Sequence, residues 1–267
     1  MVMTCLSSRL KVPGRYGTNS MKNSFSREFT VSSYDLNPKG QARLTTMANY
    51  FQEMAYHHAS QLGFGYDDMN QRKTMWVLSR MRIRINHYPV WDDKVSVETW
   101  HKGMDRLFGL RDFRVKSMDG KALGVASSAW LILDSETRRP VRPGTGVLSQ
   151  NLGTDSVFKE KLEKIPAPEQ MEELARRKVQ FSDLDIVGHV NNVKYMEWCI
   201  DALMADRSFH NEIRELEINF LHEALLGDTI TIMGTAPEMS ESGNSLLFLA
   251  RREGDDQEII RARLAWD

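Results

Sequence analysis

Two stretches of the chain repeat one pattern of hydrophobic and polar positions. Residues 80–97 and 215–232 align without a gap at an offset of 135, and in both the hydrophobic residues alternate with polar ones, stop at a turn and alternate again. Alternation with a period of two is typical of a strand with one buried face. Each stretch therefore predicts two half-buried strands joined by a tight connection.

A hydrophobic stripe with the period of a helix lies upstream of each stretch. The stripes comprise Leu44, Met47, Phe51, Met54, Ala55 and His58 in the first half, and Val193, Met196, Ile200 and Leu203 in the second. Spacings of three and four place these side chains on one helix face. Each half thus predicts a strand, a helix and several antiparallel strands. The predicted fold class is α+β, with two long helices that each pack on a curved antiparallel sheet.

Proline and glycine residues separate the two halves, with seven of them between positions 140 and 168. Such a composition is typical of a connector. We expect a tail at 1–26, an N-terminal half at 27–145, a linker at 146–172 and a C-terminal half at 173–267. Duplicated halves usually pack about a pseudo-twofold axis, like a fused homodimer. Further association of the whole chain into a homodimer is left open.

Charge is balanced overall but not along the chain. The net charge is −1, whereas residues 72–142 hold 15 Lys or Arg and 8 Asp or Glu. A balanced chain does not indicate a nucleic-acid partner. The basic stretch is interpreted either as a solvated strand surface or as a landing area for an acidic partner. No hydrophobic run reaches the length of a membrane span.

The stretch "DLDIVGHVNNVKY", residues 183–195, concentrates polar residues directly before the second predicted helix. We expect the helix to begin near Val190 or Asn191, and its first backbone N–H groups then lack partners and carry positive potential. A carbonyl oxygen placed there would be polarised, and Gly188 would allow a substrate to approach the backbone closely. The alternative is an ordinary glycine turn that leads into a capped helix.

Four segments resemble those of a known family, in the family's order. They are "NYFQEMAYHHASQLGFGYDDM", "WVLSRMRIRINHYPVWDDKVSVETW", "ASSAWLILDSETRRPVRP" and "SDLDIVGHVNNVKYMEW". They resemble the plant and bacterial acyl–acyl-carrier-protein thioesterases. This resemblance implies a tandem (double) hotdog fold and hydrolysis of the thioester between a fatty acyl chain and acyl carrier protein, without a metal or a cofactor. It also implies a role in fatty acid biosynthesis.

The resemblance assigns roles to three residues of the second half. Asp185 would orient or help to activate water, His189 would position the thioester or assist proton transfer, and Glu223 matches the acidic residue proposed as base or nucleophile. Alternatives are a capping aspartate, a hydrogen-bonded turn histidine and an exposed turn carboxylate. At the repeat offset, Tyr88 occupies the position of Glu223, so we expect the first half to be catalytically degenerate and to shape the acyl pocket.

Two positions depart from the family pattern. Plant enzymes often have cysteine after the acidic residue, where this chain has Ala224, so no cysteine nucleophile is available. The family usually has asparagine two residues after the aspartate, where this chain has Val187. A valine side chain cannot hydrogen-bond a carbonyl, so either backbone N–H groups or Asn191 would take this role.

The acyl slot is expected at the first helix and its neighbouring strand. Large hydrophobic candidates are Met47, Phe51, Met54, Met75, Trp76 and Leu78. Plain core packing is the alternative for each of them. For the carrier protein, which is acidic, Arg138, Arg139 and Arg142 are candidate contacts.

Competing functions and compartments follow from the same features. The nearest rival is an acyl-CoA thioesterase with the same fold, and a second is a non-catalytic module that binds acyl thioesters. The chain has no G-x-S-x-G motif, which argues against a serine hydrolase of the α/β class. Two cysteines fit a reducing compartment, and we expect the cytoplasm of a bacterium. The basic, serine-containing first 26 residues make plastid import the alternative.

Overall fold

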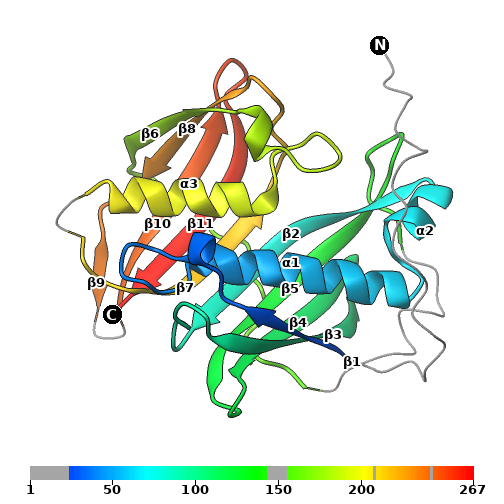
Figure 1. The fold of residues 1–267 in the computed structure, drawn as a ribbon. Helices are drawn as coiled ribbons and strands as arrows, with labels where there is room; N and C mark the ends of the chain where they lie inside the picture. Colours follow the sequence, from blue (N-terminus) through cyan, green and yellow to red (C-terminus); the bar gives the residue numbers. More distant parts are fainter. Residues whose placement is uncertain (1–23, 143–154, 207–208, 241–242) are drawn as a thin grey trace.

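The computed structural model describes residues 24–142, 155–206, 209–240 and 243–267, and these form one antiparallel eleven-stranded sheet with α-helices on it (Figure 1). The strands are β1 (Ser24–Thr30), β2 (Thr74–Ile85), β3 (Lys94–Asp105), β4 (Phe108–Ser117), β5 (Ala122–Asp134), β6 (Glu172–Lys178), β7 (Ile213–Phe220), β8 (Thr229–Gly234), β9 (Glu238–Ser240), β10 (Gly243–Arg252) and β11 (Gln257–Trp266). The helices are α1 (Leu44–Gln61), α2 (Tyr66–Gln71) and α3 (Asn192–Met204), with 3-10 turns η1 (Ser33–Asp35) and η2 (Phe181–Asp183).

The strand order, β1-β3-β4-β5-β2-β7-β11-β10-β8-β6, is symmetric about its centre. The strands at the centre, β2 and β7, come from the two repeated stretches and pair antiparallel, so that Ile83 lies opposite Leu216. Both side chains are completely buried. The α+β prediction is confirmed, with one difference. The two strands within each repeat are not neighbours, since β4 and β5 lie between β2 and β3, and the halves share one continuous sheet.

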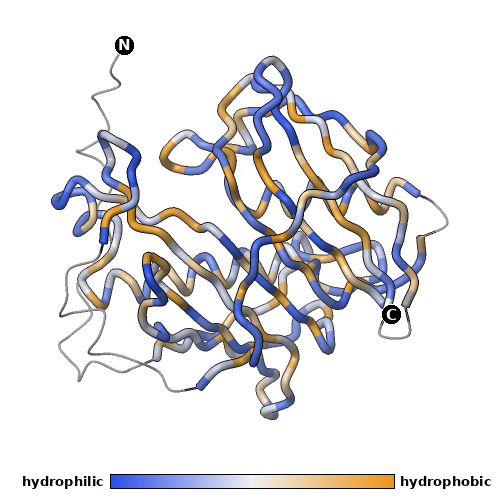
Figure 2. The backbone as a smooth tube through the Cα atoms, turned by 180° about the vertical axis from the view of Figure 1, so that it is seen from behind, coloured by the Kyte–Doolittle hydropathy of each residue, from blue (hydrophilic) through white to orange (hydrophobic). Residues whose placement is uncertain are grey.

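Helices α1 and α3 lie side by side on one face of this sheet (Figure 1). From the opposite side, the strands alternate between hydrophobic and hydrophilic positions along their length (Figure 2). The predicted stripe of α1 is buried, and Phe51 packs against Phe113 of β4 with ring centroids 5.0 Å apart. Met47 and Met54 lie in the same core, with no more than 1% of either side chain exposed.

The first strand of each half begins close to the start predicted for that half. The first strand begins at Ser24 and β6 begins at Glu172, whereas we expected the halves to begin at 27 and 173. Residues 1–23 of the predicted tail and residues 143–154 at the start of the connector lie outside the described residues. No helix in the described ranges is both long enough and hydrophobic enough to cross a membrane.

The described part of the connector, residues 155–168, crosses the junction of the two halves. The backbone N–H of Ile165 donates to Asn219 Oδ1 of β7 at 2.7 Å. Arg80 of β2 donates through Nη1 to the carbonyl of Leu162 at 2.5 Å. Phe158 and Ile165 are buried, so the connector also contributes hydrophobic packing. It thereby joins the central strands of both halves.

Candidate active site

The turn before α3 is held by the side chain of Asp185. Its Oδ1 accepts the backbone N–H groups of Val187 at 3.0 Å and His189 at 3.1 Å. The backbone N–H of Asp185 donates to the carbonyl of His189 at 2.8 Å, and Gly188 adopts a φ of 84° that favours glycine. Asp185 Oδ2 accepts no hydrogen bond from any described residue. One carboxylate oxygen therefore builds the turn and the other is available to a substrate or a water.

Helix α3 begins at Asn192, one or two residues later than predicted. Asn191 is its N-cap, and its Oδ1 accepts the backbone N–H of Val193 at 2.9 Å. Asn191 thus has a structural role at the helix start, and only its amide nitrogen remains for a substrate.

The backbone donors of this turn are nearly all occupied. Within residues 187–194, all of which the structure describes, each backbone N–H has an acceptor except that of Asn192. Asn192 lines the cavity described below. An unpaired N–H at the positive end of a helix can donate to a developing oxyanion. The sequence predicted unpaired backbone donors at the start of the helix, and within residues 187–194 the Asn192 N–H is the one that lacks an acceptor.

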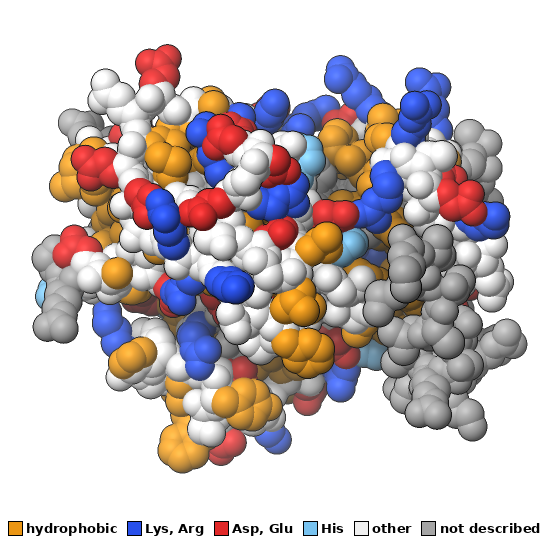
Figure 3. Space-filling view, turned by 90° about the horizontal axis from the view of Figure 1, so that it is seen from above, with side chains coloured by type: hydrophobic (Ala, Val, Ile, Leu, Met, Phe, Trp, Pro, Cys, Tyr) orange, Lys and Arg blue, Asp and Glu red, His pale blue; other side chains and the backbone are white. Residues whose placement is uncertain are grey.

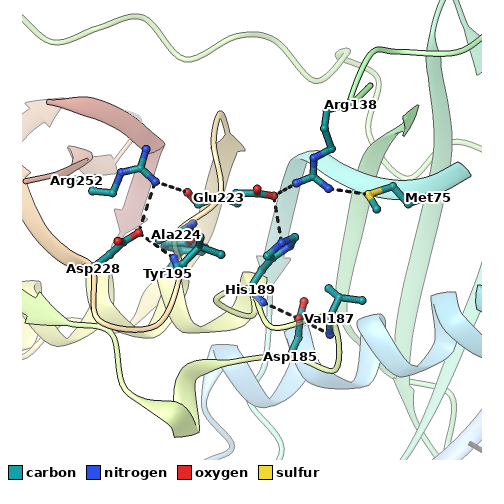
Figure 4. A network of polar contacts seen from close by, with 11 residues as sticks. Met75, Arg138, Asp185, Val187, His189, Tyr195, Glu223, Ala224, Asp228 and Arg252 are labelled. Atoms are coloured by element: carbon teal, nitrogen blue, oxygen red, sulfur yellow. Dashed lines mark hydrogen bonds and ion pairs between the residues drawn. The ribbon is translucent and has the colours of Figure 1, made fainter. Parts of the chain in front are cut away.

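Glu223 lies in the connection from β7 to β8 and points toward the turn (Figure 4). Its Oε2 is 3.4 Å from His189 Nε2. The same oxygen pairs with Nη2 of Arg138, which follows β5 in the first half. Both His189 and Glu223 are partly exposed, at 27% and 42% of their side chains. The structure therefore brings His189 and Glu223 into contact, with Asp185 in the same turn.

The backbone on both sides of Glu223 is fastened to the rest of the site. Arg252 of β10 donates through Nη1 to the carbonyl of Glu223 at 3.2 Å and pairs with Asp228 at 3.5 Å. The N–H of Ala224 donates to the Tyr195 hydroxyl of α3 at 3.1 Å. Burial raises the pKa of Tyr195, which keeps this hydroxyl protonated. These contacts fix Glu223 relative to α3.

A cavity of about 1440 Å³ opens at these residues and extends into the first half. Its walls include the Asp185 turn, Glu223 and Arg138 on one side, and parts of α1, α2 and β2 on the other. Of the predicted acyl-slot residues, Met75, Trp76 and Leu78 line it.

The remaining candidates for the acyl slot lie elsewhere. Phe51 borders a separate void of about 20 Å³, and Met47 and Met54 line neither of the two spaces. For Met47 and Met54 the structure corresponds to the core-packing alternative, because α1 turns them toward the sheet.

Trp76 is held in one position on the cavity wall. Its Nε1 donates to the carbonyl of Phe64 at 3.2 Å. A Cβ atom at Gly109 would lie 3.2 Å from the Trp76 ring, so the indole packs directly over this glycine. The ring is therefore a fixed surface rather than an adjustable one.

The surface near the opening is partly hydrophobic. Val187 is 46% exposed, Ile186 66% and Leu225 44%. Seen from above the view of Figure 1, hydrophobic, charged and histidine side chains lie next to one another on one face (Figure 3). Arg138 and Arg139 are exposed as well. Within the described residues, no group of three or more His, Cys, Asp or Glu is arranged to hold a metal ion.

Models of two protein domains match nearly the whole described chain. The acyl-ACP thioesterase N-terminal domain matches residues 22–148, and the C-terminal domain matches residues 167–267. The chain belongs to the acyl-ACP thioesterase family.

Individual proteins agree with this assignment. Oleoyl-acyl carrier protein thioesterase 1, chloroplastic, of Arabidopsis thaliana is 28% identical over 91% of the chain and 76% of its own length. The crystal structure of an acyl-ACP thioesterase from Bacteroides thetaiotaomicron has a TM-score of 0.82 and 27% identity, over 92% of this chain and 98% of that one. The structure of the 12:0-ACP thioesterase from Umbellularia californica has a TM-score of 0.80 and 25% identity, over 93% of this chain and 95% of that one. These matches confirm the double hotdog fold.

Three residues at the site of this acyl-ACP thioesterase were not predicted there. Arg138 was expected to contact a carrier protein, and its pairing with Glu223 was not predicted. Arg252 and Tyr195 were not singled out. The signal for Tyr195 was its place four residues after the N-cap Asn191, within the first turns of α3, which directs its side chain back toward the turn. Nothing local in the sequence marks Arg252, since its contact depends on the pairing of β10 with β8.

Proposed function

We propose that the chain hydrolyses the thioester of fatty acyl-acyl carrier protein and releases a free fatty acid and the holo-carrier protein. The observation that carries this proposal is the contact of Glu223 with His189 at the opening of a large cavity, beside a helix tip with an unpaired N–H. Hydrolysis needs a base for water, a donor for the oxyanion and a hydrophobic slot for the chain. Each need has a candidate group within this one site.

In the proposed reaction, Glu223 acts as general base. It takes a proton from a water whose oxygen attacks the thioester carbonyl carbon, and the carbonyl oxygen becomes an oxyanion that accepts the Asn192 N–H. The C–S bond then breaks, and the leaving thiolate takes the proton from Glu223. His189, in contact with Glu223, positions the thioester, and Asp185 Oδ2 accepts a hydrogen bond from the attacking water.

We assign the acyl chain to the first half. Its α1, α2 and β2 form the far walls of the cavity, and Trp76 and Leu78 are hydrophobic surfaces along it. Residues 27–145 would then shape the pocket, and residues 173–267 would supply most of the catalytic groups. Arg138 modifies this division, because it brings a charge of the first half to Glu223.

The carrier protein is the proposed macromolecular partner. Arg138 lines the cavity, and Arg139 is the exposed residue that follows it in the chain. Both belong to the basic stretch 72–142, which complements an acidic protein. Exposed Ile186, Val187 and Leu225 would add hydrophobic contact around the entering thioester. We place the reaction in fatty acid biosynthesis and in a reducing compartment, in keeping with the two cysteines of the chain.

The test is a panel of acyl-carrier-protein and acyl-CoA thioesters with identical acyl chains, assayed by release of free thiol. We expect kcat/KM to be higher for the carrier-protein thioesters than for the coenzyme A thioesters. Arg139→Glu reverses a charge of the basic stretch, and we expect it to reduce this preference. Preference for coenzyme A would indicate an acyl-CoA thioesterase. Tight binding without turnover of either series would indicate a non-catalytic module and would refute the proposal.

A further inference from the structure

Arg111 is a buried cation on the wall of the proposed acyl cavity. It lies in β4, lines the cavity and is only 8% exposed. Its Nη1 donates to His58 Nδ1 at 2.8 Å and to Thr99 Oγ1 at 3.2 Å. Both acceptors are uncharged, because a His58 nitrogen that accepts from a guanidinium carries no proton.

No described carboxylate neutralises this guanidinium. The adjacent Asp112 lies on the opposite face of β4, where it pairs with Lys102 at 3.2 Å and accepts from the Ser127 hydroxyl at 2.6 Å and the Val157 N–H at 3.0 Å. Burial alone lowers the pKa of Arg111 to about 10, so the group is still a cation at neutral pH. A buried charge is normally paired, because its desolvation is costly.

The guanidinium of Arg111 also has N–H donors that are not used by the described residues. Arginine carries five N–H donors, and both hydrogen bonds of Arg111 within the described residues come from Nη1. The N–H groups on Nε and Nη2 therefore have no acceptor among these residues. A hydrocarbon chain end pressed against them would remove water and return no hydrogen bond, which is unfavourable. An oxygen atom at the same place would accept one or two of them.

The position of Arg111 places it at the distal part of an acyl chain. In the sheet, β4 is three strands from β7, which leads to Glu223, and this corresponds to about 14 Å across the strands. Hydrophobic side chains of the strands in between, Leu78, Trp76 and Trp130, line the cavity along this path. A chain with its thioester at Glu223 would therefore run over hydrophobic surface first and meet the guanidinium last.

We propose that Arg111 forms a binding site for an oxygen function at the far end of the acyl group, so that the preferred substrate carries a terminal hydroxyl or carboxylate rather than a methyl group. This inference rests on the proposed thioesterase function and adds the substrate class. A carboxylate would pair with the guanidinium as two charge-assisted hydrogen bonds, and a hydroxyl would accept one.

The test compares three carrier-protein thioesters with equal carbon number, ending in a methyl, a hydroxyl or a carboxylate group. The chain length is chosen as the one that gives the highest turnover in the methyl series. We expect kcat/KM of the wild-type protein to be at least about tenfold higher for one of the oxygenated chains. A wild-type preference for the methyl-ended chain at this length would overturn the inference.

Two variants connect the preference to Arg111. Arg111→Met keeps length and removes the donors, and we expect it to favour the methyl-ended chain. Arg114→Met is the matched control, because Arg114 lies on the other face of β4 beside Glu98 and should leave the preference unchanged. If Arg111→Met does not fold, the ratio of kcat/KM for the oxygenated and methyl-ended chains in the wild-type protein decides. Unchanged selectivity in a folded Arg111→Met protein would also refute the inference.

The design separates this inference from the function on which it rests. Turnover of methyl-ended chains without preference for oxygenated ones leaves the thioesterase proposal intact and removes only the role of Arg111. Absence of turnover for every thioester removes both.

Discussion

The turns that precede α1 and α3 have the same hydrogen bonds but different chemistry. In the first half, Asn37 Oδ1 accepts the backbone N–H groups of Lys39 at 2.8 Å and Gln41 at 3.2 Å. Asp185 Oδ1 accepts the two equivalent N–H groups in the second half, at 3.0 and 3.1 Å. An amide and a carboxylate therefore build one turn equally well. The hydrogen bonds to Asp185 Oδ1 explain the turn. The second carboxylate oxygen, Oδ2, is what distinguishes the turn of the half that we propose to be catalytic, because Asn37 has an amide nitrogen in its place.

The second difference is at the position after the central strand. Tyr88 of the first half donates its hydroxyl to the carbonyl of Ile213 at 2.7 Å, and burial raises its pKa. Glu223, its equivalent at the repeat offset, instead lies at the cavity beside His189. One copy uses this position to join the two halves, and the other presents a carboxylate to the cavity. The duplicated backbone thus permits a division of labour that depends on a few side chains.

The largest expected effect follows from removing the carboxylate that the first half lacks. Glu223→Gln keeps the shape of the side chain but cannot accept a proton from water. We expect turnover to fall by more than about a hundredfold, which corresponds to about 2.7 kcal/mol of barrier. Steady-state kinetics together with the thermal midpoint will check this, and near wild-type rates would rule out the general-base role.

The matched control is at the equivalent position. Tyr88→Phe leaves the Ile213 carbonyl without its donor, at a cost of about 1–2 kcal/mol of stability. We expect it to lower the thermal midpoint while turnover per folded molecule stays within about twofold. Glu223→Gln should therefore lower the rate without lowering stability, and Tyr88→Phe should lower stability without lowering the rate.

The next largest effect is expected for Asp185→Asn, which gives the second turn the residue type of the first. The amide oxygen can still accept the N–H groups of Val187 and His189, so stability should hold. Loss of the charge on Oδ2 should reduce turnover about thirtyfold, or about 2 kcal/mol of barrier.

Asp185→Ala separates the two roles of this side chain. It removes both acceptor bonds of the turn and should in addition lower stability by about 1–2 kcal/mol. Asn37→Asp is the reciprocal control and should change neither rate nor stability strongly. Full activity in Asp185→Asn would mean that the aspartate only builds the turn.

The repeat made the fold predictable. Alternating and helical patterns identified the strands and helices of both halves, because each element has one buried face and a short sequence period. The pairing of β2 with β7 and the insertion of β4 and β5 between β2 and β3 were not predicted. These depend on contacts between residues far apart in the sequence, for which an alternating pattern gives no register.

The sequence predicted three residues of the site. Asp185 and His189, which share one turn, and Glu223, which is distant in the sequence, were singled out from the motif and the family resemblance, and the structure places Glu223 3.4 Å from His189. The pairing of Arg138 with Glu223 was not predicted, because it depends on how the two halves pack. Met47 and Met54 were assigned to the slot because size and hydrophobicity do not distinguish a side chain that faces the core from one that faces a cavity.

A smaller effect is expected from breaking the contact that makes the site depend on both halves. Arg138→Met removes the cation paired with Glu223 but keeps the length of the side chain. The carboxylate then loses its fixed position, and we expect kcat/KM to fall about tenfold, or about 1.4 kcal/mol. Arg139→Met carries the same charge change on the neighbouring exposed residue and should reduce kcat/KM by less than threefold. Equal effects of the two variants would mean that Arg138 contributes only surface charge.

The smallest effect is expected at Cys199 of α3. At the offset of 148 that aligns Asn37 with Asp185, it corresponds to Phe51 of α1. Burial raises the pKa of its thiol to about 12, so almost no thiolate exists at pH 8. In a Cys5→Ser background, iodoacetamide should therefore leave the native protein unlabelled and fully active, and should label Cys199 only after denaturation. Mass spectrometry of both samples provides the measurement. Inactivation that parallels labelling of Cys199 in the folded protein would give this half a reactive thiol in addition to the proposed base Glu223. The two halves would then differ in mechanism by more than the side chains of the turn and the carboxylate.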